Sequence, residues 1–339
     1  MTFVSGRQPL LEVEGLTVTF PTPDGDVHAV RGVDLKIDAG AVLGIVGESG
    51  SGKSVTMMAV MGLLPRSARV TGSVRFRGEE LTGLSNSEMR RFRGKQIAMI
   101  FQDPMTSMNP VFTVGWQIAE AIRVHDRQVH KAEAKRRAID LLTLVGIPQP
   151  DRRVDSYPHE FSGGMQQRAM IAMSMANDPA FLIADEPTTA LDVTIQAQIL
   201  DVLDVVRREK GIGIALITHD LGVIAGMVEE VAVMYAGQVV EQGHVDDVFY
   251  RSHHPYTRGL LASLPRLDAD GSMRLTPIRG TPPSLIRLPT GCAFHVRCPN
   301  AQPRCTQDEP VLRVVGPMRS RCHFAEELGT DAEPARTLA

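Results

Sequence analysis

The sequence lacks any long hydrophobic run, and this limits how the chain can associate with a membrane. The longest apolar stretches, such as residues 180–184 and 231–236, are much shorter than the roughly 20 residues that a membrane-spanning helix needs. The N-terminal residues also lack the apolar core of a secretory signal. We therefore expect the chain to be soluble by itself and cytosolic.

Aromatic residues and net charge are sparse as well. Only 5% of the 339 residues are aromatic, and the formal net charge is −3, from 36 Lys and Arg against 39 Asp and Glu. Nucleic-acid-binding proteins usually carry a marked positive excess, so the composition argues against a general nucleic-acid binder. Hydrophobic residues make up 43% of the chain, which is enough for ordinary globular cores, and the length fits two domains.

Cysteine is missing from residues 1–291, and the four cysteines lie close together at Cys292, Cys298, Cys305 and Cys322. Disulfides are disfavoured in the cytosol. Zinc sites usually contain pairs of cysteines two to four residues apart, and no such pair occurs here. The wider spacing and the adjacent Pro299 favour a [4Fe–4S] cluster held by all four cysteines. A zinc ion, or four free or merely structural thiols, are the alternatives.

The most informative segment that is present is residues 47–54, GESGSGKS, which matches the phosphate-binding pattern G-x-x-x-x-G-K-[ST]. It follows an apolar run at 41–46 and precedes a segment with a helical pattern. The glycines let successive N–H groups face an anion, and the dipole of the following helix favours negative charge there. We expect Lys53 to reach the β- and γ-phosphates and the Ser54 hydroxyl to bind Mg²⁺. A Gly/Ser-rich surface turn is the weaker alternative.

Polar residues follow three other apolar segments, which are predicted to be buried strands. In open α/β sheets, ligands bind outside the carboxyl ends of the strands, so one site is expected to collect these residues and the phosphate loop. Two neighbouring carboxylates repel each other, which costs free energy unless a cation binds there or one carboxylate is protonated. The residues are Gln102 after 96–101, Asp185 and Glu186 after 180–184, and His219 after 213–217.

The remaining pattern indicates an α/β fold with a parallel sheet, an antiparallel β layer, a helical subdomain and a small Cys-containing C-terminal extension. Two strand candidates precede the phosphate loop, and a third follows its helix. Apolar residues at helical spacing fill 114–146, with a charged, solvated face at 127–137. The predicted strands are 10–20, 27–37, 70–76, 96–101, 180–184, 213–217, and a hairpin of 231–235 with 238–241; the predicted helices include a capped one at 85–93 and others at 169–176 and 195–208.

An ordered set of motifs carries a family resemblance over residues 8 to about 250. The chain resembles the nucleotide-binding domain of ATP-binding-cassette (ABC) proteins, and the Asn-Lys-x-Asp motif of GTPases is absent. The resemblance implies an ATPase in which Glu186 polarises the attacking water. The set is 47–54, Gln102, Ser162-Gly163-Gly164-Met165-Gln166, Asp185-Glu186, Ala190-Leu191-Asp192 and His219.

The resemblance also implies a role for each of the other site residues. Asp185, Gln102 and Ser54 would hold Mg²⁺, and His219 would bind the γ-phosphate, the alternative being a surface histidine. Phe20 would stack on the base, or else be a core or edge aromatic. The ATP-contacting residues would be Phe20, Gly47, Glu48, Ser49, Gly50, Ser51, Gly52, Lys53, Ser54 and Val55.

A second group would contact ATP bound by a partner subunit, because cassettes of this family sandwich two ATP molecules in a head-to-tail dimer. Ser162 would donate its hydroxyl, and the two following glycines would allow close approach of the backbone. This group comprises Ser162, Gly163, Gly164, Gln166 and Asp192.

Two further stretches, residues 101–110 and 254–261, look like the ATP-binding subunits of oligopeptide and dipeptide permeases, a group that includes nickel and glutathione importers. The resemblance covers almost the whole chain, and the cysteine tail resembles domains reported to carry a [4Fe–4S] cluster. It implies ATP-driven peptide import from the cytoplasmic side of the cell membrane, with the chain bound peripherally. The implied partners are a second ATPase subunit, two membrane permease subunits and, indirectly, an extracytoplasmic solute-binding protein. The second ATPase subunit would be a paralogue, with a homodimer as the alternative.

Several expectations about organisation follow. Residues 8–250 would form the ATPase domain, with the helical subdomain at about 103–178. Residues 251–330 would form the cysteine-containing C-terminal domain, and 331–339 a flexible tail. Residues 104–116 would contact a coupling helix of a membrane subunit, with Trp116 either in that contact or in the core. Nickel or glutathione import, or a soluble ABC ATPase acting on nucleic acid or ribosomes, are the alternative functions.

Overall fold

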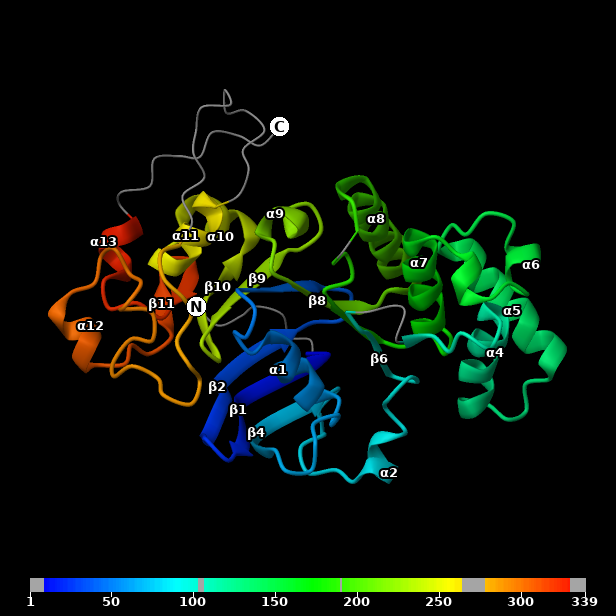
Figure 1. The fold of residues 1–339 in the computed structure, drawn as a ribbon, viewed down its shortest axis with the longest axis horizontal. Helices are drawn as coiled ribbons and strands as arrows, with labels where there is room; N and C mark the ends of the chain where they lie inside the picture. The colour runs from blue at the N-terminus through cyan, green and yellow to red at the C-terminus, as the bar shows by residue number, and fades with distance from the viewer. Residues whose placement is uncertain (1–8, 103–106, 190, 264–277, 330–339) are drawn as a thin grey trace. The chain divides into compact units, whose positions relative to one another are not determined.

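The computed structural model describes residues 9–102, 107–189, 191–263 and 278–329, which form two compact units (Figure 1). The first unit comprises the described residues of 1–10, 37–42 and 83–217, and the second those of 11–36, 43–82 and 218–339. The predicted tail at 331–339 lies outside the described residues. The second unit includes residues on both sides of the predicted boundary near residue 250. This division does not test the predicted domain limits, which stay a prediction.

Parallel strands form the centre of the first unit. Their order is β8–β7–β6, and Phe181 of β7 pairs with both Ile97 and Gly213. Phe181, Leu182 and their neighbours are fully buried, because strands covered on both faces need continuous apolar sequence. The strands are β6 (Ile97–Ile100), β7 (Phe181–Asp185) and β8 (Gly213–Thr218), as predicted from the three apolar segments.

The helices of the first unit confirm the predicted helical region. Ile118 and Ile122 of one helix and Ala138 and Leu142 of the next are buried, which is the apolar spacing read from the sequence. The helices are α2 (Asn86–Met89), α4 (Val114–His125), α5 (Lys131–Leu144), α6 (Pro150–Arg153), the 3-10 turn η1 (Pro158–Glu160), α7 (Gly163–Ser174) and α8 (Val193–Lys210).

The capping box before α2 is confirmed, but the helix is shorter than predicted. The Ser85 and Glu88 side chains each cap the other's backbone N–H. The helix ends at Met89 instead of continuing to Arg93, because Gly94 adopts a left-handed φ of +73° and Arg93 already bridges to Ile97. The chain therefore turns back early, into β6.

The second unit contains the predicted antiparallel layer. Its four strands have the order β2–β1–β4–β5, and β1 pairs antiparallel with β4. The buried residues of β1 alternate with half-buried or exposed ones, which is the pattern of a sheet with one covered face. The strands are β1 (Leu11–Thr22), β2 (Gly25–Ile37), β4 (Arg69–Phe76) and β5 (Glu79–Glu80).

The other strands of the second unit have the order β11–β12–β10–β9–β3. β3 and β9 are parallel, whereas β9 and β10 form the predicted hairpin, whose turn places Ala236 and Gly237 at φ +47° and +80°. The strands are β3 (Val42–Val46), β9 (Glu230–Tyr235), β10 (Gln238–His244), β11 (Arg313–Val315) and β12 (Met318–Ser320), and the helices are α1 (Lys53–Val60), α9 (Leu221–Ile224), α10 (Val245–Arg251), α11 (Pro255–Ala262), α12 (Pro303–Gln307) and α13 (Ala325–Gly329).

Membrane-spanning helices were not expected from the sequence. Within the described ranges, no helix is long and apolar enough to cross a membrane.

Candidate functional site

The phosphate loop lies between β3 and α1, as the motif requires. Gly47 has φ +154°, and a Cβ atom there would lie 2.2 Å from the Met234 carbonyl oxygen of β9. Gly52 has φ +101°, and a Cβ atom there would lie 2.5 Å from the Ala29 carbonyl oxygen of β2. The loop is therefore pressed against two strands, and only glycine fits at these two positions.

The Lys53 side chain points into the curve of the loop. Its ammonium group donates to the carbonyl oxygens of Gly47, at 2.7 Å, and Glu48, at 3.1 Å, and only 5% of the residue is exposed. The Gly237 N–H donates to the Ser51 carbonyl at 3.0 Å, so the β9–β10 hairpin also holds the loop. The loop thus places a buried cation where the phosphate motif predicts it.

Four other predicted ligands belong to this unit: two in the first turn of α1, one in the antiparallel sheet and one after β8. Ser54 and Val55 are half-buried in the first turn of α1. Phe20 is half-buried near the end of β1, so its stacking on a base stays a prediction. His219 follows β8 and is exposed, and its contact with the γ-phosphate also stays a prediction.

The first unit holds the predicted catalytic carboxylates. Asp185 is the last residue of β7 and is 7% exposed. Glu186 follows it with a left-handed φ of +48°, a conformation that is costly for a residue other than glycine and that clusters at functional sites. Its N–H donates to the Ile217 carbonyl of β8 at 2.9 Å, which fixes the turn.

Two side chains donate to the same oxygen of Glu186. The Gln102 amide nitrogen lies 3.1 Å from Glu186 Oε2, and the Thr189 hydroxyl lies 2.9 Å from it. The structure therefore brings the predicted Gln102 and Glu186 together. Thr189 was missed in the sequence, although its place three residues after Glu186 in a tight turn is the signal that identifies it.

The signature segment begins α7. Ser162 caps this helix by accepting from the Met165 N–H at 3.4 Å, and Ser162 and Gly163 are exposed. A Cβ atom at Gly164 would lie 2.9 Å from Ile195 Cγ2 of α8, so the two helix starts are in close contact. Exposed N–H groups at the first turn of a helix can bind an anion, and the contact of these residues with a partner's ATP stays a prediction.

Gln166 is oriented differently from the prediction. It is 7% exposed, and its amide nitrogen donates to the carbonyl oxygens of Pro158, at 2.9 Å, and Phe161, at 3.2 Å. Its side chain therefore stabilises the segment before the signature instead of pointing outward. Asp192 is exposed and caps α8, since its Oδ1 accepts from the Ile195 N–H at 2.9 Å.

An exposed aromatic pair lies just beyond the Gln102 segment. Phe112 and Trp116 stack with ring centroids 4.0 Å apart, and Trp116 is 48% exposed. The interpretation of Trp116 as a core residue is therefore wrong: the buried face of α4 is formed by other side chains, such as Ile118 and Ile122. Residues 104–106 of the predicted contact segment lie outside the described part of the chain.

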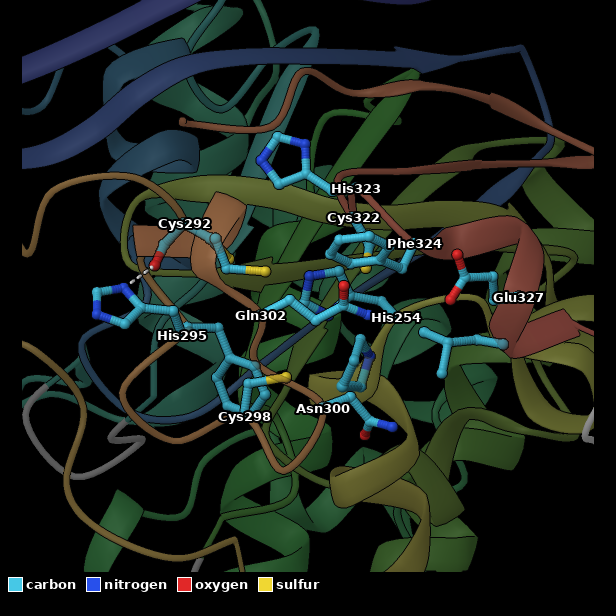
Figure 2. A pocket seen from close by; sticks show the side chains of 14 residues that line it. His254, Cys292, His295, Cys298, Asn300, Gln302, Cys322, His323, Phe324 and Glu327 are labelled. Atoms are coloured by element: carbon cyan, nitrogen blue, oxygen red, sulfur yellow. Dashed lines mark hydrogen bonds between the residues drawn. The ribbon is translucent and has the colours of Figure 1, made fainter. Parts of the chain in front are cut away.

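The four cysteines line one pocket of the second unit (Figure 2). None forms a disulfide. Burial raises the pKa of the Cys298 thiol to about 11 and that of Cys322 to about 12. Among the described residues, no group of three or more His, Cys, Asp or Glu side chains is arranged to hold a metal ion. The predicted iron–sulfur ligands thus converge on one pocket without forming a preassembled ligand set.

Two residues of the C-terminal segment contact the phosphate loop, and the sequence did not predict either contact. Arg297 forms a two-pronged ion pair with Glu48, with N···O distances of 2.6 and 2.9 Å. The Tyr256 hydroxyl accepts from the Glu48 N–H at 2.8 Å. Tyr256 lies in the motif at 254–261, and Arg297 precedes Cys298 in the sequence, but neither position indicates its partner.

The fold is that of ATP-binding-cassette (ABC) proteins. It is similar to the ATP-binding cassette MJ0796 in a dimeric structure with ADP and Pi, with a TM-score of 0.62, 26% sequence identity, and coverage of 69% of this chain and 98% of that one. The ABC transporter family model matches residues 30–189, and the model of the oligopeptide/dipeptide transporter C-terminal region matches residues 240–305.

The sequence comparisons identify the particular family. The chain is 52% identical to the oligopeptide transport ATP-binding protein OppD of Salmonella typhimurium over 94% of this chain and 95% of the relative. It is 56% identical to OppD of Mycobacterium tuberculosis over 93% of this chain but spans only 52% of that relative's length. The chain belongs to the family of ATP-binding subunits of oligopeptide and dipeptide ABC transporters.

Proposed function

We propose that the chain binds and hydrolyses ATP to energise the import of di- or oligopeptides through a membrane permease complex. The observation that carries the proposal is the similarity to the Salmonella oligopeptide transport protein along 95% of that protein's length. The chain spans about half the length of its mycobacterial relatives, so activity, substrate and partners are proposals. Nickel or glutathione import, and action on nucleic acid or ribosomes, are the outcomes that a test must separate.

The residues of the two units support the ATP chemistry separately. In the second unit, Lys53 would bind the β- and γ-phosphates, Ser54 would contribute its hydroxyl to Mg²⁺, and His219 would bind the γ-phosphate. In the first unit, Asp185 and Gln102 would be ligands of Mg²⁺. Oxygen ligands from carboxylate, amide and hydroxyl groups suit this hard cation, which usually keeps several waters in its shell.

Glu186 would act as the general base for the attacking water. A general base must be held in a fixed orientation within hydrogen-bonding distance of the proton that it accepts. The Gln102 and Thr189 donors, together with the Glu186 N–H bond to Ile217, supply that fixed orientation within the first unit. Gln102 would also sense the γ-phosphate, because it contacts the base directly.

We propose that a second ATPase subunit completes each ATP site. The support is the outward-facing start of α7, where Ser162 and Gly163 are exposed, and the neighbouring exposed Asp192. These groups would contact the nucleotide held by the partner, so that ATP binding closes the dimer and hydrolysis opens it. The partner would be a paralogue. Copurification of a second, different ATPase chain with this one tests that, and a homodimer is the other outcome.

The exposed aromatic pair would contribute to docking on the membrane subunits. Phe112 is 38% exposed and Trp116 48%, and the neighbouring Val111 is 69% exposed; apolar groups gathered on a surface mark interaction sites. This attachment would place the chain peripherally at the cytoplasmic face of the cell membrane, with an extracytoplasmic solute-binding protein acting indirectly.

The cysteine pocket is proposed to hold a [4Fe–4S] cluster with a structural role. The support is chemical: four thiols line one pocket, and thiolates are the ligands that iron–sulfur clusters use. Zinc, or four unliganded thiols, would contradict it. The test is iron and acid-labile sulfide content after anaerobic purification, with absorbance near about 400 nm. Replacement of Cys305 by Ser should remove both signals.

The transport proposal is tested by expressing the chain with its permease and solute-binding partners and measuring uptake of labelled di- and oligopeptides. ATP-dependent uptake is expected for the wild type. Glu186→Gln should lower ATP hydrolysis by about 10²- to 10⁴-fold while ATP still binds. Glu209→Gln, at an exposed glutamate of α8, is the control. Uptake of nickel or glutathione but not peptides, or copurification with ribosomes in place of membrane proteins, would contradict the proposal.

A further inference from the structure

The Arg297–Glu48 ion pair joins the cysteine segment to the phosphate loop. The Arg297 side chain is 4% exposed and that of Glu48 28%, so the pair is shielded from most solvent. Both terminal nitrogens of the guanidinium donate, one to each carboxylate oxygen. Such fork-shaped pairs fix orientation as well as charge, which a lysine cannot do.

Other contacts hold Arg297 in place. Its Nε donates to the Arg279 carbonyl at 3.0 Å, and one terminal nitrogen lies 3.4 Å from the Tyr235 hydroxyl. The Phe294 ring packs edge-on against Tyr235, with centroids 5.2 Å apart, and against Tyr256, at 5.4 Å. The arginine is thus positioned by a packed aromatic cluster and is not a mobile surface side chain.

Residue 48 is held at two points. Arg297 binds its carboxylate, while the buried Tyr256 hydroxyl accepts its backbone N–H at 2.8 Å. Both partners come from the part of the chain beyond residue 250. The conformation of a loop that wraps phosphates with its backbone therefore depends on side chains of the C-terminal segment.

Charge makes this arrangement significant for nucleotide binding. Glu48 places a carboxylate in the loop that would surround the phosphates, where it would repel a polyanion. We propose that Arg297 is a positioning residue for the ATP site: it neutralises Glu48 and fixes the phosphate loop, so the cysteine segment is an integral part of the nucleotide site. The inference rests on ATP binding by residues 47–54, which is part of the proposed function.

The cysteine pocket has a direct connection to this contact. Arg297 lies between Cys292 and Cys298, which both line the pocket, and the Arg297 N–H donates to the Phe294 carbonyl at 2.9 Å. The short segment that carries the Arg297 guanidinium to Glu48 therefore also lines the cysteine pocket.

The test is equilibrium ATP binding by the full-length chain, with folding checked by circular dichroism. Arg297→Gln should weaken ATP binding about tenfold, because the Glu48 charge is left uncompensated. Adding Glu48→Gln should restore the affinity to within about threefold of wild type, since the repelling charge is removed. Arg304→Ala, in an exposed ion pair of the same segment, should leave binding unchanged.

Rescue separates this role from a merely structural one, because lost packing at Arg297 would not be repaired by a change at Glu48. If Arg297→Gln does not fold, the ATP affinity of the single variant Glu48→Gln is the test. Its unpaired Arg297 guanidinium should tighten ATP binding several-fold and make the affinity more sensitive to salt. Unchanged affinity in Arg297→Gln, no rescue, or unchanged affinity in Glu48→Gln would overturn the inference. A wild-type chain that binds no ATP would instead overturn the proposed function.

Discussion

The Gln102 amide nitrogen and the Thr189 hydroxyl both donate to Oε2 of Glu186, at 3.1 and 2.9 Å. Two donors on one oxygen restrict rotation of the carboxylate and fix the direction of its other oxygen. Thr189 lies three residues after Glu186 in the same turn, whereas Gln102 comes from the end of a different strand. One donor therefore keeps the base oriented independently of any movement of Gln102.

Replacing Thr189 by valine should remove that fixed orientation without changing side-chain volume. We expect kcat for ATP hydrolysis to fall by about tenfold, because one hydrogen bond to a charged group is lost, while ATP affinity is retained. Thr189→Ser keeps the hydroxyl and should retain most of the activity. Steady-state ATPase assays on the assembled complex measure both; equal kcat values for the valine and serine variants would show that the bond is unimportant.

Replacing Gly47 by alanine should disrupt the phosphate loop even without nucleotide. The added methyl group would lie 2.2 Å from the Met234 carbonyl oxygen, and backbone can relieve this only by moving β9 or the loop. We expect a loss of about 2–4 kcal/mol in stability together with weak ATP binding. Thermal unfolding and nucleotide titration measure the two effects.

Gly15→Ala is the matched control for that experiment. Gly15 also has a left-handed φ, of +57°, but a Cβ atom there meets nothing within 4 Å. Only the backbone strain of about 1–2 kcal/mol applies, and ATP binding should be unaffected. A Gly47→Ala variant as stable as Gly15→Ala would mean that the loop relaxes freely.

A buried carboxyl group should give the second unit a pH-dependent stability. Burial raises the pKa of Glu241 to about 7, and the Ser252 hydroxyl donates to its side chain at 2.7 Å. The unfolded chain loses this proton at lower pH, so folding takes up a proton between about 4.5 and 7. This contribution to stability is therefore complete below that range, falls as the pH rises through it, and stays absent above it.

Glu241→Gln should remove this part of the pH dependence, because glutamine is neutral throughout. The difference in melting temperature between the variant and the wild type should widen in favour of the variant as the pH rises from about 5 to 7. Glu229→Gln, at an exposed glutamate, should run parallel to the wild type. A constant difference for Glu241→Gln across this range would show that its carboxyl is ionised in the folded chain.

The stacked aromatic pair predicts a docking defect that leaves ATP binding intact. Trp116→Ala should reduce copurification with the permease subunits by about tenfold, as expected for a buried aromatic anchor at an interface. Val124→Ala removes another exposed apolar side chain of α4, 62% exposed in the structure, and should have no effect. Equal recovery of the complex with both variants would place the contact elsewhere.

Local pattern predicted most of the fold. Buried strands such as β7 and β8 are continuous apolar segments, and the β9–β10 turn is marked by Ala236-Gly237. The phosphate loop and the Glu186 region were predicted because their spacing is a short-range property of the chain. The same pattern did not predict that the Gln166 side chain is buried. Its amide nitrogen donates to two backbone carbonyl oxygens, and motif spacing cannot identify such acceptors.

Long-range contacts account for what the sequence did not predict. Tyr256 and Glu48 are 208 residues apart, and Arg297 and Glu48 are 249 apart. No periodicity or motif spacing encodes such a pair, which forms only when the C-terminal segment packs against the loop. The sequence also did not decide whether Trp116 is exposed or buried, because burial on α4 depends on which face the neighbouring helix covers.

Strand β12 pairs antiparallel with β10, and the Arg321 N–H extends this contact by donating to the Val240 carbonyl at 2.8 Å. The C-terminal segment thus contributes a strand to the same sheet as the hairpin that supports the phosphate loop. A tail taken from a related subunit would have to supply a strand that pairs with β10. A chain cut after α10 would leave the edge of β10 unpaired, and such an edge is a template for self-association. The segment is therefore part of the sheet that supports the phosphate loop, and its removal should promote self-association of the chain.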